Sequence, residues 1–450
     1  MVRGVALVAL VTACSFQLPG AGGGGDDVVV PPDAGGDGGM TLDCGAPATF
    51  ADGLVPTTTV FVSPTAGATQ DGTQANPFRR VAQAMPAAPG TRIVLAAGNY
   101  PDEVLNDVHG TATAPIWIEG PASGQRARFD PGTSGLHFVK PQFVVVRHVD
   151  IAGTSAAAIN IDDGGDRANP VAHHIVIEDA QLTSSGAGVQ LSGVSDVTVR
   201  DVVATSVGKG VFAVGVHRAT FARLRITSAN VGVQVAGGSD AITIRQSVIA
   251  SSGTRPIWLG GSSGEDEFRP PLTAATGNYE ASNIRVIDNV LVGGVTMVMC
   301  SLCTQSLVAA SFIHGDLATQ HVVRLFNEHG ALGGHAFAPA GSMRFIDNAI
   351  HVSTDPFGFK LEAGTDGASC SFSHNLWLET DDPPNSEPVL PTPDPVGIYG
   401  MPSGYDDTGK LCTGAAQHAG IALPEVAGTL DGTCRSDPPS IGPSEPAPGC

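Results

Sequence analysis

Short apolar runs recur along the middle of the chain at intervals of about 22 residues. Within each run apolar and polar residues alternate, and Gly, Asn, Asp and Ser separate one run from the next. Two sets of runs keep this spacing: Ile175–Asp179, Val197–Asp201, Ala219–Arg223 and Ile242–Gln246 form the first, and Val189–Leu191, Val211–Ala213, Val233–Val235 and Ile257–Leu259 form the second. This pattern predicts several short strands in every repeat.

A repeat this short cannot bury its own apolar face, so successive repeats have to stack on one another. Each strand then pairs with the same strand of the next repeat, about 4.8 Å away. The pattern therefore predicts an all-β fold, a right-handed parallel β-helix over residues 58–380. A leucine-rich repeat needs a Leu and Asn frame that is absent here, and a β-propeller needs units about twice as long.

A short helix is expected just before the repeats. Phe78, Val81, Ala82 and Met85 have the spacing of one apolar helical stripe, and Pro86 ends it. We expect this helix to cap the N-terminal end of the solenoid, which would otherwise expose unpaired strand edges.

Residues 1–14 have the features of a lipoprotein signal peptide. Arg3 supplies a basic start, and the apolar stretch that follows is too short to span a bilayer. The stretch ends at Val11-Thr12-Ala13-Cys14, which resembles the bacterial lipobox, whose Cys carries the lipid. Because no Asp follows Cys14, resemblance to bacterial sorting favours the outer membrane or cell surface. An ordinary signal peptide cut near Ala13 is the alternative.

The two ends of the mature chain are poor in core-forming residues. Residues 15–57, rich in Gly and Pro, are expected to be a flexible tether. Residues 381–450 are expected to be an irregular tail that relies on disulfides, because they contain Cys412, Cys434 and Cys450. Cys300 and Cys303 lack the second pair of a zinc site, so a local disulfide or two packed thiols are expected.

The charge of the chain excludes some partners. With 23 basic and 43 acidic side chains, its net charge is −20. Nucleic-acid binding requires a basic face, so we expect no nucleic-acid partner. Membrane contact is expected through the N-terminal lipid alone, and the protein is expected to be a monomer.

Several segments resemble a known family. Val286–Leu291, Phe345–Ile350 and Phe372–Trp377 resemble the recurring turn of the pectin-lyase-like right-handed β-helix superfamily, in which Asn residues stack. Pro89–Tyr100 and Gly110–Ile118 are similar to the first rungs of chondroitinase B and alginate lyases. The resemblance implies the fold over residues 58–380. It does not imply one activity, because the fold hosts lyases, glycoside hydrolases, esterases and non-catalytic adhesins.

One outward position on the strand after the longer turn keeps its register through the repeats. The residues at this position are His137, Asn160, Gln190, Phe212, Gln234, Trp258 and, after two less regular rungs, Arg324 and Lys360. Insertions at 162–172, 260–282, 327–341 and 362–368 follow the same strands and would form a wall beside them. Amides and aromatic rings bind sugars, so we predict a groove whose substrate-binding residues are Asn160, Gln190, Phe212, Gln234 and Trp258. A plain solvated face is the alternative.

Polysaccharide lyases of the family use a Lys or Arg base, with a calcium ion or second Arg at the uronate carboxylate. By that resemblance Arg324 and Lys360 are the catalytic candidates, and two adjacent cations would lower the pKa of the lysine. The candidate metal is Ca²⁺, and its candidate ligands are Asp162, Asp163 and Asp166; solvated turns are the alternative. A group close in sequence, His314, His321, His329 and His335, matches no metal motif.

The sequence thus predicts a surface-anchored β-helix that binds an extracellular polysaccharide, with lyase activity on a uronate polymer as an option. Whether the chain is an enzyme is left open; if it is, a lyase is favoured over a glycoside hydrolase. A non-catalytic structural or adhesive surface protein is the alternative.

Overall fold

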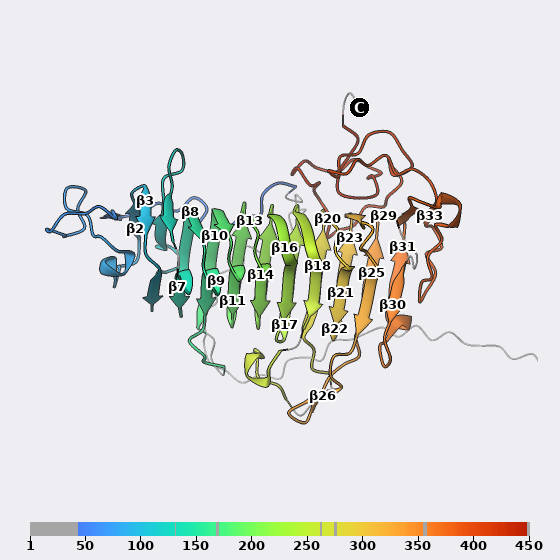
Figure 1. Cartoon of the computed structure of the whole chain (residues 1–450), viewed down its shortest axis with the longest axis horizontal. Helices are drawn as coiled ribbons and strands as arrows, with labels where there is room; N and C mark the ends of the chain where they lie inside the picture. The colour runs from blue at the N-terminus through green and yellow to red at the C-terminus, as the bar shows by residue number, and fades with distance from the viewer. Residues whose placement is uncertain are drawn as a thin grey trace, which may run out of the picture. The chain divides into compact units, whose positions relative to one another are not determined.

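A computed structural model describes residues 44–130, 132–167, 171–261, 263–273, 277–353 and 358–447 (Figure 1). The predicted lipobox Cys14 and the predicted tether up to residue 43 lie outside the described residues. Among the residues described, no helix is both long enough and apolar enough to cross a membrane.

The described chain is a parallel β-helix whose strands fall into three ladders (Figure 1). The first ladder contains β4 (Glu103–Asn106), β7 (Ser134–Val139), β9 (Ala157–Asp162), β11 (Ala187–Ser192), β14 (Lys209–Val214), the second halves of β16 (Arg225–Ala236) and β18 (Val248–Gly260), β21 (Thr296–Ser301), β25 (His321–Phe326) and β30 (Phe359–Leu361).

The second ladder lies on the next side of the solenoid. It contains β1 (Thr58–Val62), β2 (Thr91–Leu95), β5 (Ile116–Glu119), the first halves of β8 (Gln142–Ala152) and β10 (Ala172–Thr183), β12 (Val194–Arg200), β15 (His217–Ala222), β17 (Ser239–Arg245), β19 (Ala281–Ile287), β22 (Cys303–Thr304), β23 (Ser306–Ala309), β28 (Met343–Ile346) and β31 (Ser371–Ser373).

The third ladder closes the cross-section. It contains β3 (Gly98–Tyr100), β6 (Ala127–Phe129), the second halves of β8 and β10, β13 (Val203–Thr205), the first halves of β16 and β18, β20 (Val290–Val292), β24 (Phe312–His314), β29 (Ala349–Val352), β32 (Leu376–Glu379) and β33 (Ile398–Tyr399). Long strands such as β10 bend from one ladder into the next, which joins the ladders into one continuous sheet.

Inward side chains form the core as columns that run from rung to rung. One column of the second ladder contains Ile177, Val199, Phe221 and Ile244, which pair in register and are completely buried. Stacking therefore buries apolar surface that a single repeat would expose, as the alternation predicts.

The corner between the second and third ladders is built from two columns of residues, which are both mostly polar in the later rungs. One residue per rung has a left-handed backbone there, as in Asp201, Asp288 and Asp347, each with φ of 57°. The residue that follows is buried in the later rungs and joins a hydrogen-bonded ladder. Asn348 Oδ1 accepts from the backbone N–H of Ser311 at 3.2 Å, and Asn375 Oδ1 accepts from that of Asn348 at 3.1 Å. The Asn stack implied by the family resemblance is therefore confirmed.

The predicted capping helix is wrong in type and length. The segment forms one 3-10 turn, η1 (Val81–Ala84), with Val81 and Ala84 buried and Ala82 exposed. Met85 precedes Pro86 and takes an extended backbone, because the proline ring disfavours a helical conformation in the residue before it. The turn therefore ends before an α-helix can form, although its two buried residues pack against the first core rungs.

The predicted tether is too long at its C-terminal end. Residues 44–57 lie on the solenoid, where Phe50, Ala51 and Leu54 pack against Trp117 and its outward neighbours on the second ladder. A disulfide joins Cys44 to Cys434. This apolar patch and the disulfide hold the segment, which its Gly- and Pro-rich context does not reveal.

The C-terminal tail is mostly irregular, and it covers outward apolar residues of the later rungs. Leu423 and Val426 pack on the second ladder at Leu307, and Leu411 and Ile441 pack in the cluster that contains Phe312 of the third ladder. The described residues contain three further single 3-10 turns, η2 (Glu265–Glu267), η3 (Gly367–Ser369) and η4 (Pro383–Asn385).

The states of the remaining cysteines agree only in part with those expected from the sequence. Cys300 and Cys303 form the expected local disulfide. In the tail Cys412 is also disulfide-bonded, whereas Cys370 is a buried free thiol.

Two buried aspartates attach the tail to the corner. Arg435 Nη2 donates to Asp288 Oδ1 at 2.6 Å, and the backbone N–H of Ile421 donates to the Asp347 carboxylate at 3.0 Å. Burial raises the pKa of Asp288 to about 6 and that of Asp347 to about 7, although the positive charge of Arg435 opposes both shifts. The folded protein thus holds these protons more tightly than an unfolded chain would.

The stabilising contribution of Asp347 protonation should be complete below about pH 4 and should be lost as the pH rises through about 7. An asparagine cannot ionise and can still accept the Ile421 N–H. We therefore expect the melting temperature of Asp347→Asn, relative to wild type, to increase between pH 5 and pH 8. The exposed Asp381→Asn variant should show no such trend. If the melting temperatures of wild type and Asp347→Asn changed in parallel with pH, the raised pKa of Asp347 would be contradicted.

Candidate functional site

The predicted column of outward residues is assembled by the pairing of the first ladder, whose strands lie side by side in Figure 1. In register, each residue of the following series pairs with the next: His137, Asn160, Gln190, Phe212, Gln234, Trp258, Met299, Arg324 and Lys360. Only the Met299 rung separates Trp258 from Arg324, where two were expected. The structure therefore brings the predicted residues onto one face, and their roles stay predictions.

The same strands carry three further basic side chains that the sequence-based prediction did not include, Lys209, Arg255 and His321. Arg255 pairs with Val231, which pairs with Lys209, and His321 pairs with Thr296. Lys209 and His321 are the first residues of β14 and β25, and this position gave a usable signal. An irregular register in β18, at the insertion before Arg255, obscured it.

Cations lie over the two aromatic rings of the column. Lys209 Nζ is 3.3 Å from the centre of the Phe212 ring, and Arg255 Cζ is 4.0 Å from the centre of the Trp258 ring. Burial lowers the pKa of Lys209, and burial together with the charge of Arg324 lowers that of Arg255. Phe212 and Trp258 are therefore not bare stacking platforms, because each forms part of a cation–π pair.

Gln234 is not open to a ligand, in contrast to the prediction. The residue is 4% exposed, and its Nε2 donates to the backbone carbonyl of Gly260 at 3.3 Å. The start of the loop after β18 covers it. Asn160 and Gln190 are only partly buried, and Asn160 Oδ1 has no hydrogen-bond partner within the described part of the chain.

The insertions form one connected wall along an edge of the first ladder, below the strands in Figure 1. Asp163 and Arg269, from the insertions after β9 and β18, make a buried ion pair with N–O distances of 2.6 and 3.2 Å. The insertion after β25 carries the hairpin β26 (Ala331–Leu332) and β27 (His335–Ala336). It contacts the previous insertion through Phe337, whose ring centre is 5.6 Å from that of Phe268.

Glu280 holds the C-terminal end of the middle insertion. Its buried carboxylate accepts from the backbone N–H of Gly237 at 2.8 Å and from Ser263 Oγ at 2.6 Å. Burial raises the pKa of Glu280 to about 7. These contacts make Glu280 a support for the wall.

The three aspartates predicted to bind Ca²⁺ are not arranged as a metal site. Asp163 is paired with Arg269, and Asp162 Oδ2 lies 2.6 Å from Nε2 of His137. Asp166 donates its backbone N–H to the Asp163 carbonyl at 3.5 Å. Within the described ranges no group of three His, Cys, Asp or Glu could hold a metal ion. Asp162 and Asp163 thus have protein partners from other segments, and the Ca²⁺ site stays a prediction.

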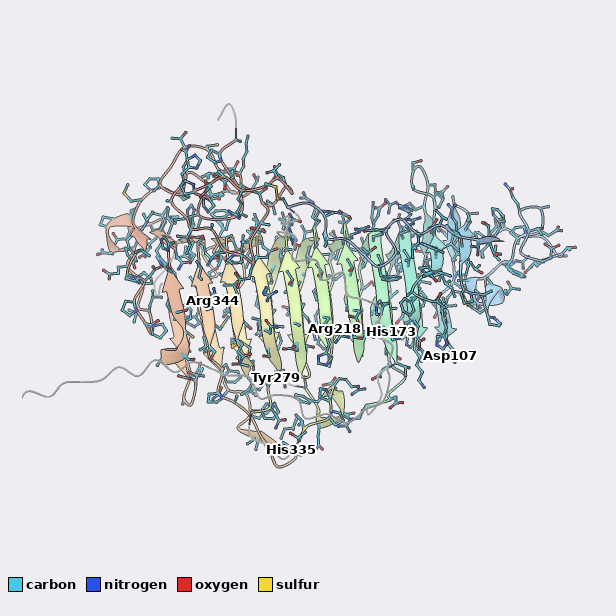
Figure 2. The ribbon with its side chains drawn as sticks, turned by 180° about the vertical axis from the view of Figure 1, so that it is seen from behind. Asp107, His173, Arg218, Tyr279, His335 and Arg344 are labelled. Carbon is cyan, nitrogen blue, oxygen red and sulfur yellow. A yellow bond between two sulfur atoms is a disulfide. The ribbon has the colours of Figure 1, made fainter. Side chains whose placement is uncertain are left out.

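The histidines that lie close in sequence are separated in the fold. His314 lies on the third ladder in register with His351, and His321 lies on the first ladder. His329 and His335 belong to the wall, where His335 is seen at the edge of the molecule in Figure 2. His321 alone joins the outward face near Arg324 and Lys360.

Arg324, Lys360 and Glu362 form a charged cluster at the C-terminal end of the column. Glu362 Oε1 is 2.9 Å from Arg324 Nη2 and 3.4 Å from Lys360 Nζ. Although desolvation opposes the shift, the hydrogen bond from Arg324 and both positive charges hold the pKa of Glu362 below its usual value. Burial and then the charges of Lys360 and Arg324 lower the pKa of His321, which favours a neutral imidazole. The two predicted catalytic cations are thus adjacent, with a carboxylate against both.

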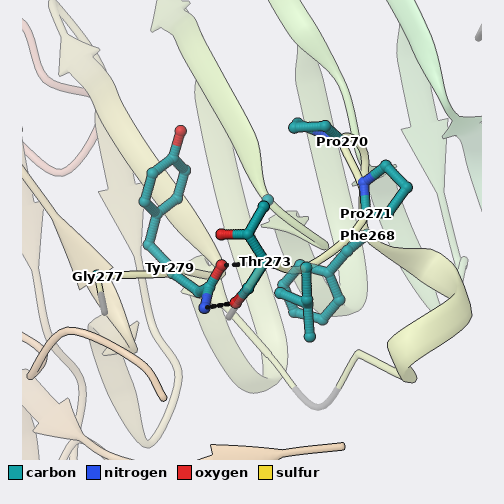
Figure 3. A pocket seen from close by; sticks show the side chains of 9 residues that line it. Phe268, Pro270, Pro271, Thr273, Gly277 and Tyr279 are labelled. Atoms are coloured by element: carbon teal, nitrogen blue, oxygen red, sulfur yellow. Dashed lines mark hydrogen bonds between the residues drawn. The ribbon is translucent and has the colours of Figure 1, made fainter. Parts of the chain in front are cut away.

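A separate pocket of about 190 Å³ lies within the middle insertion (Figure 3). It is lined by Phe268, Pro270, Pro271 and Tyr279, and the amide of Asn278 is bonded to the Thr273 backbone at its edge. None of the residues that line it is charged. The pocket therefore lacks the charged groups found on the outward column.

Removal of Arg269 should loosen the wall. Arg269→Met leaves Asp163 buried without its cation, which should lower the free energy of unfolding by about 3–5 kcal/mol. Denaturant titration measures this loss, and amide exchange of residues 264–273 should accelerate. As a control, Arg218→Met breaks the more exposed pair with Asp196 (Arg218 is labelled in Figure 2) and should cost less than about 1 kcal/mol. Equal losses in the two variants would contradict the importance of the buried pair.

Comparisons with known proteins agree with this architecture. Residues 134–293 match the family model described as "Right handed beta helix region". No curated protein matches the sequence. Among solved structures, pectate lyase Pel9A is similar with a TM-score of 0.50 and 13% identity, over 88% of this chain and 98% of that one.

Two further structures show lower similarity. A rhamnogalacturonan lyase has a TM-score of 0.49 and 12% identity, over 74% of this chain and 89% of its own. An alginate lyase from Paenibacillus sp. str. FPU-7 has a TM-score of 0.40 and 15% identity, over 71% of this chain and 99% of its own. With the ladders and the Asn stack, the family model identifies the fold of the chain as a right-handed parallel β-helix.

Proposed function

We propose that the first ladder and its wall bind a carboxylate-bearing polysaccharide. The observation that carries the proposal is the group of Arg255, Arg324 and Lys360 beside Trp258 on one outward face. The later rungs of the other two ladders have outward faces covered by the tail, and the N-terminal segment covers part of the second ladder.

Charge supports an anionic ligand at this place. A molecule with a net charge of −20 repels anions at long range, so a local group of cations has to reverse the field. Arg324 lowers the pKa of Arg255 through its positive charge, so the two guanidinium groups act on the same region. A carboxylate placed there would relieve their mutual repulsion.

The length of the column favours a polymer. Seven rung steps separate Asn160 from Lys360, which is about 34 Å at the usual strand spacing. The N-terminal half offers the amides of Asn160 and Gln190, which suit sugar hydroxyl groups. Neutral parts of a glycan would lie there, and a carboxylate would lie near Arg324.

If this outward face is catalytic, its residues suit elimination. His321 or Lys360 would take the proton from the carbon that bears the carboxylate, while Arg324 binds the carboxylate. The electron pair forms a carbon–carbon double bond, and the bond to the leaving sugar oxygen breaks. A neutral imidazole is a competent base near neutral pH, which adds His321 to the candidates.

Trp258→Ala should weaken binding of neutral and acidic oligosaccharides alike by about tenfold, because ring contact does not depend on ligand charge. Calorimetry with cellotetraose and tetragalacturonate measures both affinities. Val203→Ala, on the third ladder, is the matched control and should bind as wild type does. Unchanged binding in a folded Trp258→Ala variant would remove the ring from the site.

Lys360→Ala should reduce tetragalacturonate affinity about tenfold and leave cellotetraose affinity unchanged, because only the acidic ligand uses the ammonium charge. It should also reduce any product with an unsaturated uronate, which absorbs in the ultraviolet. Lys410→Ala makes the same charge change in the tail and should have no effect. If Lys360→Ala loses the unsaturated product but keeps its affinity for tetragalacturonate, Lys360 is favoured as the base. If neither the product nor the affinity changes, the adhesive alternative is favoured.

We also propose that a lipid on Cys14 anchors the protein at the cell surface. The proposal rests on the lipobox-like sequence and on the predicted tether after it. Cys14→Ser should move the protein from the membrane fraction to the soluble fraction. An unchanged distribution, with full export, would contradict a lipid anchor.

A further inference from the structure

The cationic end of the column already contains a carboxylate. Glu362 follows β30, and its Oε1 lies 3.1 Å from Arg324 Nε, 2.9 Å from Arg324 Nη2 and 3.4 Å from Lys360 Nζ. This is the contact that a carboxylate of the proposed ligand would make. Glu362 therefore carries the same carboxylate group as the proposed ligand, and this group contacts the same two cations, Arg324 and Lys360.

The backbone of Glu362 is fixed independently of this contact. Its N–H donates to the carbonyl of Leu325 at 3.1 Å, and its own carbonyl accepts from Thr365 Oγ1 at 2.8 Å. The side chain is partly exposed, with 29% of its surface accessible. It can therefore rotate away from Arg324 without a change in the surrounding turn.

The cations stay in place when the carboxylate leaves. Arg324 is held in the ladder between Met299 and Lys360, and its guanidinium carbon lies 5.1 Å from the centre of the Phe326 ring. Ring contact keeps the guanidinium group on this face after its ion pair is broken. The geometry thus provides an exchangeable carboxylate on a prearranged pair of cations.

We propose that Glu362 is a built-in competitor that occupies the ligand's carboxylate seat until a polymer displaces it. This inference rests on the proposed function and specifies how affinity is set at the same site. An exposed ion pair is weak, so displacement costs little for a ligand that also contacts the rest of the column. A small carboxylate gains no such contacts, and the competitor on the same chain has a high effective concentration. Glu362 therefore selects oligomers over monomers.

The test is Glu362→Gln in the full chain, with tetragalacturonate, galacturonate and cellotetraose as probes. Glutamine keeps the size of the side chain and removes its charge. We expect tetragalacturonate to bind about threefold to tenfold more tightly, galacturonate to gain measurable affinity, and cellotetraose to be unchanged. Asp366→Asn makes the same change of net charge in the same loop and should alter affinity less than about 1.5-fold.

The outcomes separate the two proposals. If wild type binds tetragalacturonate through Trp258 but Glu362→Gln binds equally or more weakly, the competitor role is wrong and the groove stands. If Asp366→Asn gives the same gain as Glu362→Gln, net charge explains the effect and the specific contact does not. If neither wild type nor Glu362→Gln binds any of the three probes, the proposed function fails and this inference fails with it.

Discussion

Backbone pairing between successive rungs is the constraint on which the rest of this molecule depends. A parallel pair fixes which residue lies beside which, so one register error would turn every inward side chain outward. Columns such as Ile177, Val199 and Phe221 make that error costly, because their burial requires the observed register. The same register that builds the core also places Trp258, Arg324 and Lys360 on one face.

The sequence revealed those features that follow from periodicity. The fold and the order of the outward column follow from a spacing that repeats, and the Asn stack was implied by the family resemblance. The buried state of Gln234 and the pairing of Asp163 with Arg269 do not, because they depend on how two long insertions meet. The repeat placed the insertions beside the first ladder as a wall, but local composition could not show which partner each charge would find.

The two ends of the chain illustrate the same limit. Residues 44–57 resemble a linker in composition, yet Phe50 and Leu54 cover an outward apolar patch around Trp117. Pro86 correctly marked the end of η1, but the residue before a proline avoids helical geometry, so the preceding stripe could not complete an α-helix. At both places a single neighbouring feature outweighed the average character of the segment.

The disulfide between Cys44 and Cys434 has a mechanical consequence. The carbonyl of Cys44 accepts from Gln246 Nε2 at 2.9 Å, at the corner between the second and third ladders, and Arg435 is bonded to Asp288 nearby. A pulling force applied to the chain before Cys44 would therefore reach the solenoid at its middle rungs. The disulfide would divide this force between the segment that follows Cys44 and the tail around Cys434.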